Sequence, residues 1–291
     1  MGPAAQLFGG QSMTTTLRRV LVRPPAAVGF GAWREYGWRA EPDVPKLAAE
    51  HEAFCEALGQ GGAEVVAAGS AVLDDPDAIY VFDPAIVCDD GAILLRPGKE
   101  GRLVELDAIA ADFEQAGVPI VARLDEPELA DGGDTLWLDG STLLAGRGYR
   151  TNDEGIDALQ SALPDVDVLT FDLPHLQGEE VVLHLLSLLS PLDADLVVAY
   201  LPLLPVRLVQ LLGALEIQIV AVPDEEFETM GPNVLALAPR VALALEGNDV
   251  TRKRLERAGV DVSVYKGDEI SRKGDGGPTC LTRPLLRADR A

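Results

Sequence analysis

Residues 233–267 read NVLALAPRVALALEGNDVTRKRLERAGVDVSVYKG, and three kinds of sequence pattern follow one another in this stretch. Two short apolar runs predict a β-hairpin over residues 233–247. The charged stretch 248–259 predicts a helix that Asn248 or Asp249 caps and Gly259 ends. The apolar run 260–267 predicts one more strand. The order of the unit is therefore hairpin, helix, strand.

The same order recurs three times upstream, each time with glycine or proline between the elements. In the first unit the hairpin, helix and strand are predicted at 83–98, 103–117 and 118–124. In the second they are predicted at 134–148, 153–164 and 166–173. In the third they are predicted at 183–202, 205–216 and 217–223. A fifth unit forms only if the two ends of the chain meet. Residues 279–287 and 18–25 would then make the hairpin, 44–62 the helix and 63–69 the strand.

Units of this kind cannot each bury their own apolar face, so we expect them to pack around a common centre. The predicted fold is α/β, a five-bladed pseudosymmetric propeller built from ββαβ units. A doubly wound sheet with extra hairpins is the alternative that the pattern leaves open. We expect residues 17–291 to form a single domain and residues 1–16 to be a disordered N-terminal extension.

Composition restricts the classes of partner. The 291 residues carry a formal net charge of -23, which disfavours nucleic acid and anionic membranes and favours a small cation. No apolar run is long enough to span a bilayer, and the first residues do not resemble a signal peptide, so we expect a cytoplasmic protein. The three cysteines lack metal-ligand spacing, which predicts free thiols and no metal site.

A polar or reactive residue stands at the start of the first strand of every predicted hairpin. Equivalent positions in a ring of repeats meet at one end of its axis, so these residues are expected to converge. They are Asp83, Asp131, His184, Asn233 and Cys280.

Each of these residues also has a structural interpretation. Asp83 before a proline and Asp131 before two glycines have the sequence of turn residues. His184 lies among leucines, as a core histidine does, and a lone cysteine such as Cys280 is usually a small buried hydrophobe. Four polar or reactive residues at one repeat position are hard to explain by packing, because each would need a partner when buried. We therefore favour a functional site.

The combination of groups indicates the chemistry. A cysteine with a histidine can substitute at an acyl or amidine carbon. Two added carboxylates would repel an oxyanion, but they suit a guanidinium, whose planar N–H donors pair with carboxylates. The bound cation would in turn favour the thiolate of Cys280.

Ordered motifs along the chain resemble the guanidino-group modifying enzymes, which include arginine deiminases, amidinotransferases and dimethylarginine dimethylaminohydrolases. The matching segments are RRVLVRPP, PDAIYVFDPAIV, LLRPGKEGR, LADGGDTLWLDG, LLAGRGYRTNDEG, VLHLLS and GGPTCLTRPL. They cover nearly the whole chain after residue 16. The propeller of that family agrees with the ring read from the repeats.

The resemblance implies roles for the candidate residues. Cys280 would be the nucleophile, His184 the general acid and base, Asp131 the first carboxylate of the DGGD motif and Asp83 the second guanidinium ligand. At the other end of the substrate, Asp77 would bind an α-amino group. An α-carboxylate would be clamped by Arg102 and Arg150.

Within the family, the dimethylarginine dimethylaminohydrolases are the nearest match. The motif DGGD has aspartate where deiminases usually have glutamate, and Leu186 replaces an aspartate that deiminases use. Phe82 departs from the pattern, because dimethylaminohydrolases usually have an acid there. Residues 30–43 fall where the family has a mobile substrate lid, and an aromatic cluster packing against the first helix is an equal alternative.

The sequence thus predicts a cofactor-independent hydrolase that cleaves a C–N bond of dimethylarginine or a related guanidine, giving citrulline and an amine. An arginine deiminase or an amidinotransferase could use the same residues. A guanidine-binding module without activity and a ring-shaped scaffold are the non-enzymatic alternatives. The expected partner is the small guanidino substrate, and a homodimer is compatible with a domain of this size.

Overall fold

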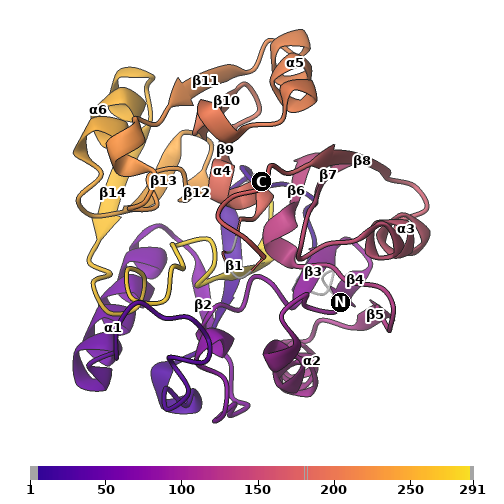
Figure 1. The fold of residues 1–291 in the computed structure, drawn as a ribbon, viewed down its shortest axis with the longest axis vertical. Helices are drawn as coiled ribbons and strands as arrows, with labels where there is room; N and C mark the ends of the chain where they lie inside the picture. The colour runs from indigo at the N-terminus through magenta and orange to yellow at the C-terminus, as the bar shows by residue number, and fades with distance from the viewer. Residues whose placement is uncertain (1–5, 180, 182, 289–291) are drawn as a thin grey trace, which may run out of the picture.

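A computed structural model describes residues 6–179, 181 and 183–288. Within these residues, five three-stranded sheets are arranged in a ring and their helices lie on the outside (Figure 1). Each sheet holds an antiparallel hairpin and a third strand parallel to its middle strand. The fold is a five-bladed α/β propeller, which confirms the prediction from the repeats.

The blades follow the predicted order of hairpin, helix and strand. The strands of the first three complete blades are β3 (Ala85–Cys88), β4 (Gly91–Leu94), β5 (Ile120–Arg123), β6 (Thr135–Asp139), β7 (Thr142–Arg147), β8 (Asp167–Asp172), β9 (Leu189–Asp193), β10 (Leu196–Ala199) and β11 (Gln218–Ala221). Those of the other two are β12 (Val234–Ala238), β13 (Val241–Leu245), β14 (Asp261–Tyr265), β15 (Arg283–Arg287), β1 (Leu17–Val22) and β2 (Glu64–Ala67).

Helices connect the second and third strand of each blade. They are α1 (Val44–Gln60), α2 (Leu106–Gln115), α3 (Asp153–Ala162), α5 (Val206–Ala214) and α6 (Asp249–Arg257), with a short α4 (Leu185–Leu188) before β9. Short 3-10 turns precede several elements, among them η2 (Pro76–Ile79), η3 (Glu100–Glu105) and η4 (Gly132–Asp134). No helix in the described part of the chain is long and apolar enough to cross a bilayer.

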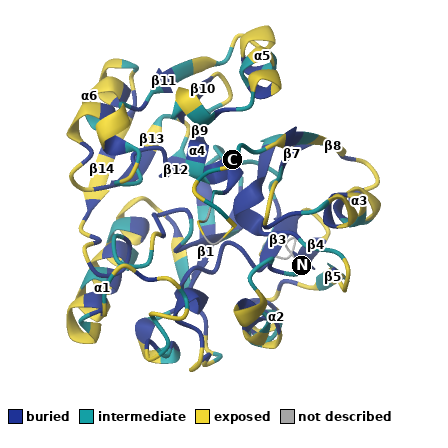
Figure 2. Ribbon diagram, viewed as in Figure 1, coloured by how far each residue is buried: buried dark blue, intermediate teal, exposed yellow. Residues whose placement is uncertain are grey.

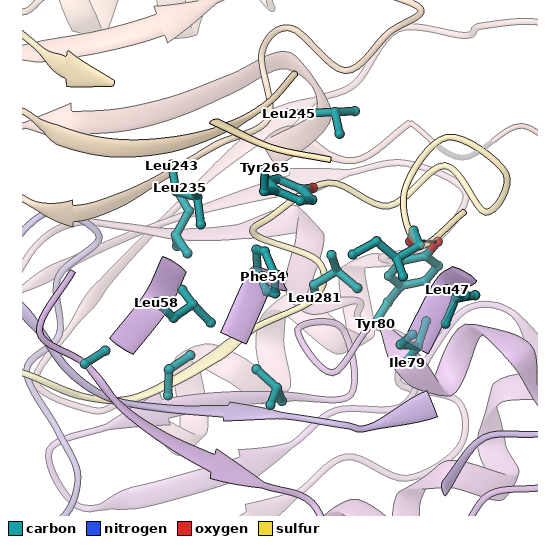
Figure 3. Close-up of a cluster of buried hydrophobic side chains, with 14 of the residues drawn as sticks. Leu47, Phe54, Leu58, Ile79, Tyr80, Leu235, Leu243, Leu245, Tyr265 and Leu281 are labelled. Atoms are coloured by element: carbon teal, nitrogen blue, oxygen red, sulfur yellow. Dashed lines mark hydrogen bonds between the residues drawn. The ribbon is translucent and has the colours of Figure 1, made fainter. Parts of the chain in front are cut away.

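The fifth blade joins the two ends of the chain, as the sequence predicted. Strand β15 pairs antiparallel with β1, where Val20 lies opposite Pro284, and β2 pairs parallel with β1. Hydrophobic residues of this blade and of the preceding blade, β12–β14, form one buried cluster, in which Phe54 of α1 packs on Tyr265 of β14 (Figure 3). Leu281, next to Cys280, belongs to the same cluster. The position of the candidate nucleophile therefore depends on the packing that closes the ring.

Residues 6–16 differ from the expected disordered extension. Gly9 exchanges backbone hydrogen bonds with the edge of β15: its N–H donates to the carbonyl of Leu285 at 2.8 Å, and the N–H of Arg287 donates to its carbonyl at 3.0 Å. The physical reason is the open edge of β15, whose backbone groups need partners. Residues 1–5 lie outside the described residues.

The start of α6 differs in detail from the prediction. Asn248 is the N-cap residue, but its side chain makes no capping bond. The carboxylate of Glu226 accepts hydrogen bonds from the backbone N–H groups of Val250 and Thr251 instead, both at 2.7 Å. A residue from the loop before the blade therefore caps the helix, which local sequence could not indicate. Gly259 has φ +86°, in line with its predicted place after the helix.

Burial follows the ring. The helices expose one face and the third strand of each blade is partly exposed, while the two hairpin strands and the residues at the starts of the first strands are mostly buried (Figure 2). Several buried charged residues, among them Asp83, Asp131 and His184, lie at the starts of first strands. Buried charge is costly, so these groups must satisfy one another.

Candidate active site

The five hairpin-start residues come from all five blades and lie within five residues before a first strand. Asp83 precedes β3, Asp131 precedes η4 and β6, and His184 is the N-cap of α4 before β9. Asn233 directly precedes β12 and Cys280 lies shortly before β15. The repeat position predicted from sequence is thus the position that they occupy.

His184 lies between the two predicted carboxylates. Its Nε2 is 3.0 Å from Oδ2 of Asp131, and its Nδ1 is 3.8 Å from Oδ1 of Asp83. All three side chains are buried. The imidazole therefore faces a carboxylate on each of its two nitrogens.

Backbone amides fix both carboxylates. The N–H of Gly133 donates to Oδ1 of Asp83 at 2.9 Å, and the N–H of Gly98 donates to Oδ1 of Asp131 at 2.8 Å. A Cβ at Gly133 would lie 2.3 Å from Nδ1 of His184, so this position requires glycine. The DGGD motif, residues 131–134, thus supplies a carboxylate, an amide donor and the space for the imidazole.

The acids determine the charge of His184. Burial alone would lower its pKa, but the carboxylates of Asp83, Asp134 and Asp131 outweigh burial and raise the pKa to about 9. Burial would raise the pKa of Asp83, yet His184 and Arg102 hold it below its usual range. Near neutral pH, the histidine is therefore an imidazolium beside a carboxylate.

Asp83, Asp131 and His184 could also approach one metal ion, because an atom from each lies within 4.8 Å of the others. A metal would have to displace the proton of His184, whereas an organic cation can pair with the two carboxylates and leave that proton in place.

Cys280 is joined to the same group of residues. Nδ2 of Asn233 donates to its Sγ at 3.4 Å, and the backbone N–H of Phe82 donates to its carbonyl at 3.2 Å. Burial, with a smaller contribution from the charge of Asp83, raises the pKa of Cys280 to about 11. Without a ligand, the cysteine is therefore a thiol.

Asn233 was singled out by its repeat position but had no predicted role. Since its amide stabilises the thiolate, we expect Asn233→Ala to raise the pH of half-maximal Cys280 alkylation by about 0.5 to 1, the effect of a hydrogen bond of about 1 kcal/mol. Iodoacetamide labelling across pH, read by mass spectrometry at each cysteine, measures this shift. Cys55, which has no contact with Asn233, is the internal control, and an unchanged Cys280 profile would contradict the assignment.

Arg102 has other partners than the expected substrate carboxylate. Its Nε donates to Glu105 at 2.6 Å, one terminal nitrogen to Asp83 at 2.5 Å, and the other to the carbonyl of Tyr80 at 2.9 Å. It is 4% exposed. Each of its three nitrogens has a protein partner, so Arg102 positions Asp83 in this structure.

Asp77 is likewise occupied. Its Oδ1 accepts from Nε1 of Trp38 at 2.8 Å, and its Oδ2 accepts from Nζ of Lys99 at 2.6 Å. Trp38 belongs to residues 30–43, the segment for which a lid and an aromatic cluster were both open. The structure agrees with the aromatic cluster, because Trp38 is in the core cluster, and Tyr36 contacts Lys99 and Gly101 beside the candidate site. A lid role for the segment stays a prediction.

Arg150 lies on the wall of a cavity of about 200 Å³ whose other walls include Leu173, Leu176 and Leu183. A Cβ at Gly98 would meet the Cα of Arg150 at 2.7 Å, so the backbone of Arg150 lies against the loop that holds Asp131. Its use as a carboxylate ligand stays a prediction.

Sequence reasoning missed Arg283. Its guanidinium stacks on the ring of Phe82 at 3.5 Å from the centroid and hydrogen-bonds to the carbonyl of the same residue. The side chain is buried, and burial lowers its pKa to about 9. At the position where dimethylaminohydrolases are expected to have an acid, this chain thus has the ring of Phe82, which stacks against Arg283. No sequence signal linked the two, since they are about 200 residues apart.

Comparison with known proteins agrees with this geometry. A family model described as arginine deiminase matches residues 201–287. The chain is 31% identical over 186 residues to the N(G),N(G)-dimethylarginine dimethylaminohydrolase of Streptomyces coelicolor, covering 64% of this chain and 69% of that protein. It is 27% identical over 244 residues to the enzyme of that name from Pseudomonas aeruginosa, covering 83% of this chain and 89% of that protein.

Solved structures share the fold. The Pseudomonas aeruginosa dimethylaminohydrolase, a cysteine-to-serine mutant with citrulline, has a TM-score of 0.76 and 22% identity, with coverage of 93% of this chain and 100% of that chain. An amidinotransferase from Microseira wollei has a TM-score of 0.81 and 17% identity, with coverage of 98% of both chains. The chain therefore belongs to the guanidino-group modifying superfamily, close to the dimethylarginine dimethylaminohydrolases.

Proposed function

We infer that this protein hydrolyses a C–N bond of an arginine-like guanidine through a covalent adduct on Cys280. Membership of the superfamily makes it an enzyme acting on carbon–nitrogen bonds of linear amidines. The observation that carries the proposal is a buried imidazolium held between two carboxylates, with a thiol from the closing blade in the same group of contacts. These groups have the charge and donor pattern for a planar cation.

In the first half of the reaction, Asp83 and Asp131 hold the guanidinium while Cys280 releases its proton to solvent water. When the guanidinium binds, its positive charge offsets the negative charge of Asp83, which lowers the pKa of the Cys280 thiol. Sγ forms a bond to the guanidinium carbon. The bond from that carbon to the departing nitrogen then breaks, and His184 gives this nitrogen its proton, so an amine leaves and an amidino adduct remains on sulfur.

In the second half, the neutral His184 takes a proton from water as the water oxygen attacks the adduct carbon. The C–S bond breaks, the electron pair returns to sulfur, and the thiolate takes the hydroxyl proton of the adduct, so the product is a neutral urea and Cys280 is again a thiol. His184 has regained the proton that it lost. The departed amine takes up the proton that Cys280 first released, so water has been added across one C–N bond and the positive charge leaves with the protonated amine.

Apolar residues beside the acids favour a substituted guanidine. Phe82 and Leu186 are buried in one hydrophobic cluster, the first where dimethylaminohydrolases usually have an acid and the second where deiminases have an aspartate. N-methyl groups are better accommodated next to hydrocarbon than next to a further charge. With a methylated arginine the products would be citrulline and a methylamine, and with another guanidine the analogous urea.

Product analysis tests the proposal. The protein is incubated separately with arginine, monomethylarginine and asymmetric dimethylarginine, and the ureas and amines are identified by mass spectrometry. We expect a urea product that requires Cys280 and, with water as acceptor, carries oxygen from H₂¹⁸O. Transfer of the amidino group to an added amine, with no urea, would instead show an amidinotransferase. Absence of both products would contradict the proposal.

A further inference from the structure

The two ends of the candidate substrate site differ in charge. At the reacting end, Asp83 and Asp131 surround His184 and have been described above. The other end lies next to it along the chain. The N–H of Gly98 binds Asp131, and the side chain of the following residue, Lys99, binds Asp77. What Lys99 does there determines which substrates can bind.

Lys99 already fills the place that an ammonium group would take. Its Nζ lies 2.6 Å from Oδ2 of Asp77, while Trp38 occupies the other oxygen of the same carboxylate. The side chain of Asp77 is 12% exposed and that of Lys99 is 22% exposed, so the pair is largely shielded from water. Both carboxylate oxygens therefore have a donor before any substrate arrives.

Displacing Lys99 would break more than one contact. The same Nζ donates to the carbonyl of Tyr36 at 2.7 Å and lies 4.5 Å from the centroid of the Tyr36 ring. The Tyr36 hydroxyl in turn donates to the carbonyl of Gly101 at 2.8 Å. Lys99 thus ties Asp77 to the segment that covers this end, and an incoming ammonium would have to disrupt that connection.

The charge of Asp77 is already matched by Lys99, and the backbone of Arg150 lies against Gly98. A second ammonium at Asp77 would meet the like charge of Lys99, whereas a carboxylate would be attracted by it.

We propose that Lys99 is a specificity-determining residue, and that it selects ω-guanidino carboxylic acids that lack an α-ammonium group over arginine-type amino acids. The proposal rests on the proposed function, because it names the substrate class of that same site. It leaves the reacting end unchanged, so N-methylated and unmethylated members of the class are both included.

The experiment compares two ligands that differ only in the α-ammonium group, arginine and its des-amino analogue. Calorimetry on the Cys280→Ser variant measures binding without turnover, and kcat/KM is measured on the enzyme with its cysteine. We expect the des-amino compound to be preferred by about 10-fold or more, the effect of one unmade charged hydrogen bond. Lys99→Met, which frees Asp77, should shift the ratio toward arginine by about 10- to 100-fold.

Matched variants separate charge from structure. Lys99→Arg should keep the original preference, and Lys46→Met removes a lysine from an exposed ion pair with Asp43 and should change nothing. Thermal unfolding checks that each variant is folded, and Lys99→Gln serves as the second neutral variant.

Preference for arginine in the unmodified site, or a ratio unchanged by both Lys99→Met and Lys99→Gln, would overturn the inference while leaving the proposed function intact. Preferential binding of the des-amino compound without hydrolysis of either ligand would support the inference and overturn the proposed function. Binding of neither ligand would overturn both.

Discussion

Cys280→Ser should reduce hydrolysis by a factor on the order of 10⁴ or more, the usual cost of removing a catalytic nucleophile. The serine hydroxyl is a far weaker nucleophile at neutral pH, and the buried site offers it no base strong enough to compensate. The substitution changes little in size, so the carboxylates and His184 keep their places. Ligand binding should therefore persist while the covalent adduct disappears.

Rapid quenching followed by intact-protein mass spectrometry detects the adduct, and calorimetry measures binding. Cys88→Ser is the matched control, because Cys88 is a buried thiol in β3 outside the site and should affect turnover little. Two results would contradict the assignment. Turnover within 10-fold of the unmodified enzyme would exclude Cys280 as the nucleophile, and an equal loss in Cys88→Ser would indicate a structural effect.

His184→Gln should lower kcat by about 10²- to 10⁴-fold, the range for loss of a general acid and base. Glutamine can still donate to Asp131, but it cannot give a proton to the departing amine or take one from water. Cleavage of a guanidine with a poorer leaving group should suffer more than cleavage of one with a better leaving group. The comparison of leaving groups separates proton transfer from a loss of packing, which would affect both substrates alike.

The pH dependence follows from the same residue. Since the pKa of His184 is raised to about 9, kcat should fall as pH rises through about 9, because the acid form is lost. A histidine with a raised pKa in the folded state also contributes stability that is fully present below its ordinary pKa of about 6.5 and lost as pH rises through the folded value. The melting temperature should therefore drop more for His184→Gln at pH 6 than at pH 10. An equal drop at both values would contradict an imidazolium at this site.

Much of the fold was predictable because each blade repeats a local pattern. Stretches such as 233–267 carry their hairpin, helix and strand in the spacing of apolar residues and in glycines such as Gly259. Repetition then implied a ring, and the ring implied that hairpin starts meet. The approximate grouping of Asp83, Asp131, His184 and Cys280 needed no more than that.

Partner choice among buried charges was less accessible to sequence. Arg102 was expected to reach a substrate carboxylate, but it binds Asp83 and Glu105. Asp77 was expected to be open, but it is paired with Lys99. Which acid pairs with which base depends on distances of a few ångströms among side chains from different blades, and no spacing along the chain encodes them.

The sequence by itself determined the five repeats, the closure of the ring by the chain ends, and the position in each repeat where chemistry could occur, because these depend on local apolar periodicity. Only the tertiary structure decided that Gly9 pairs with the edge of β15, that Glu226 caps α6, and that Arg283 stacks on Phe82. The reason is physical: an unsatisfied sheet edge, a helix terminus and a buried charge each take the nearest suitable partner in space, and distance along the chain does not constrain which one that is.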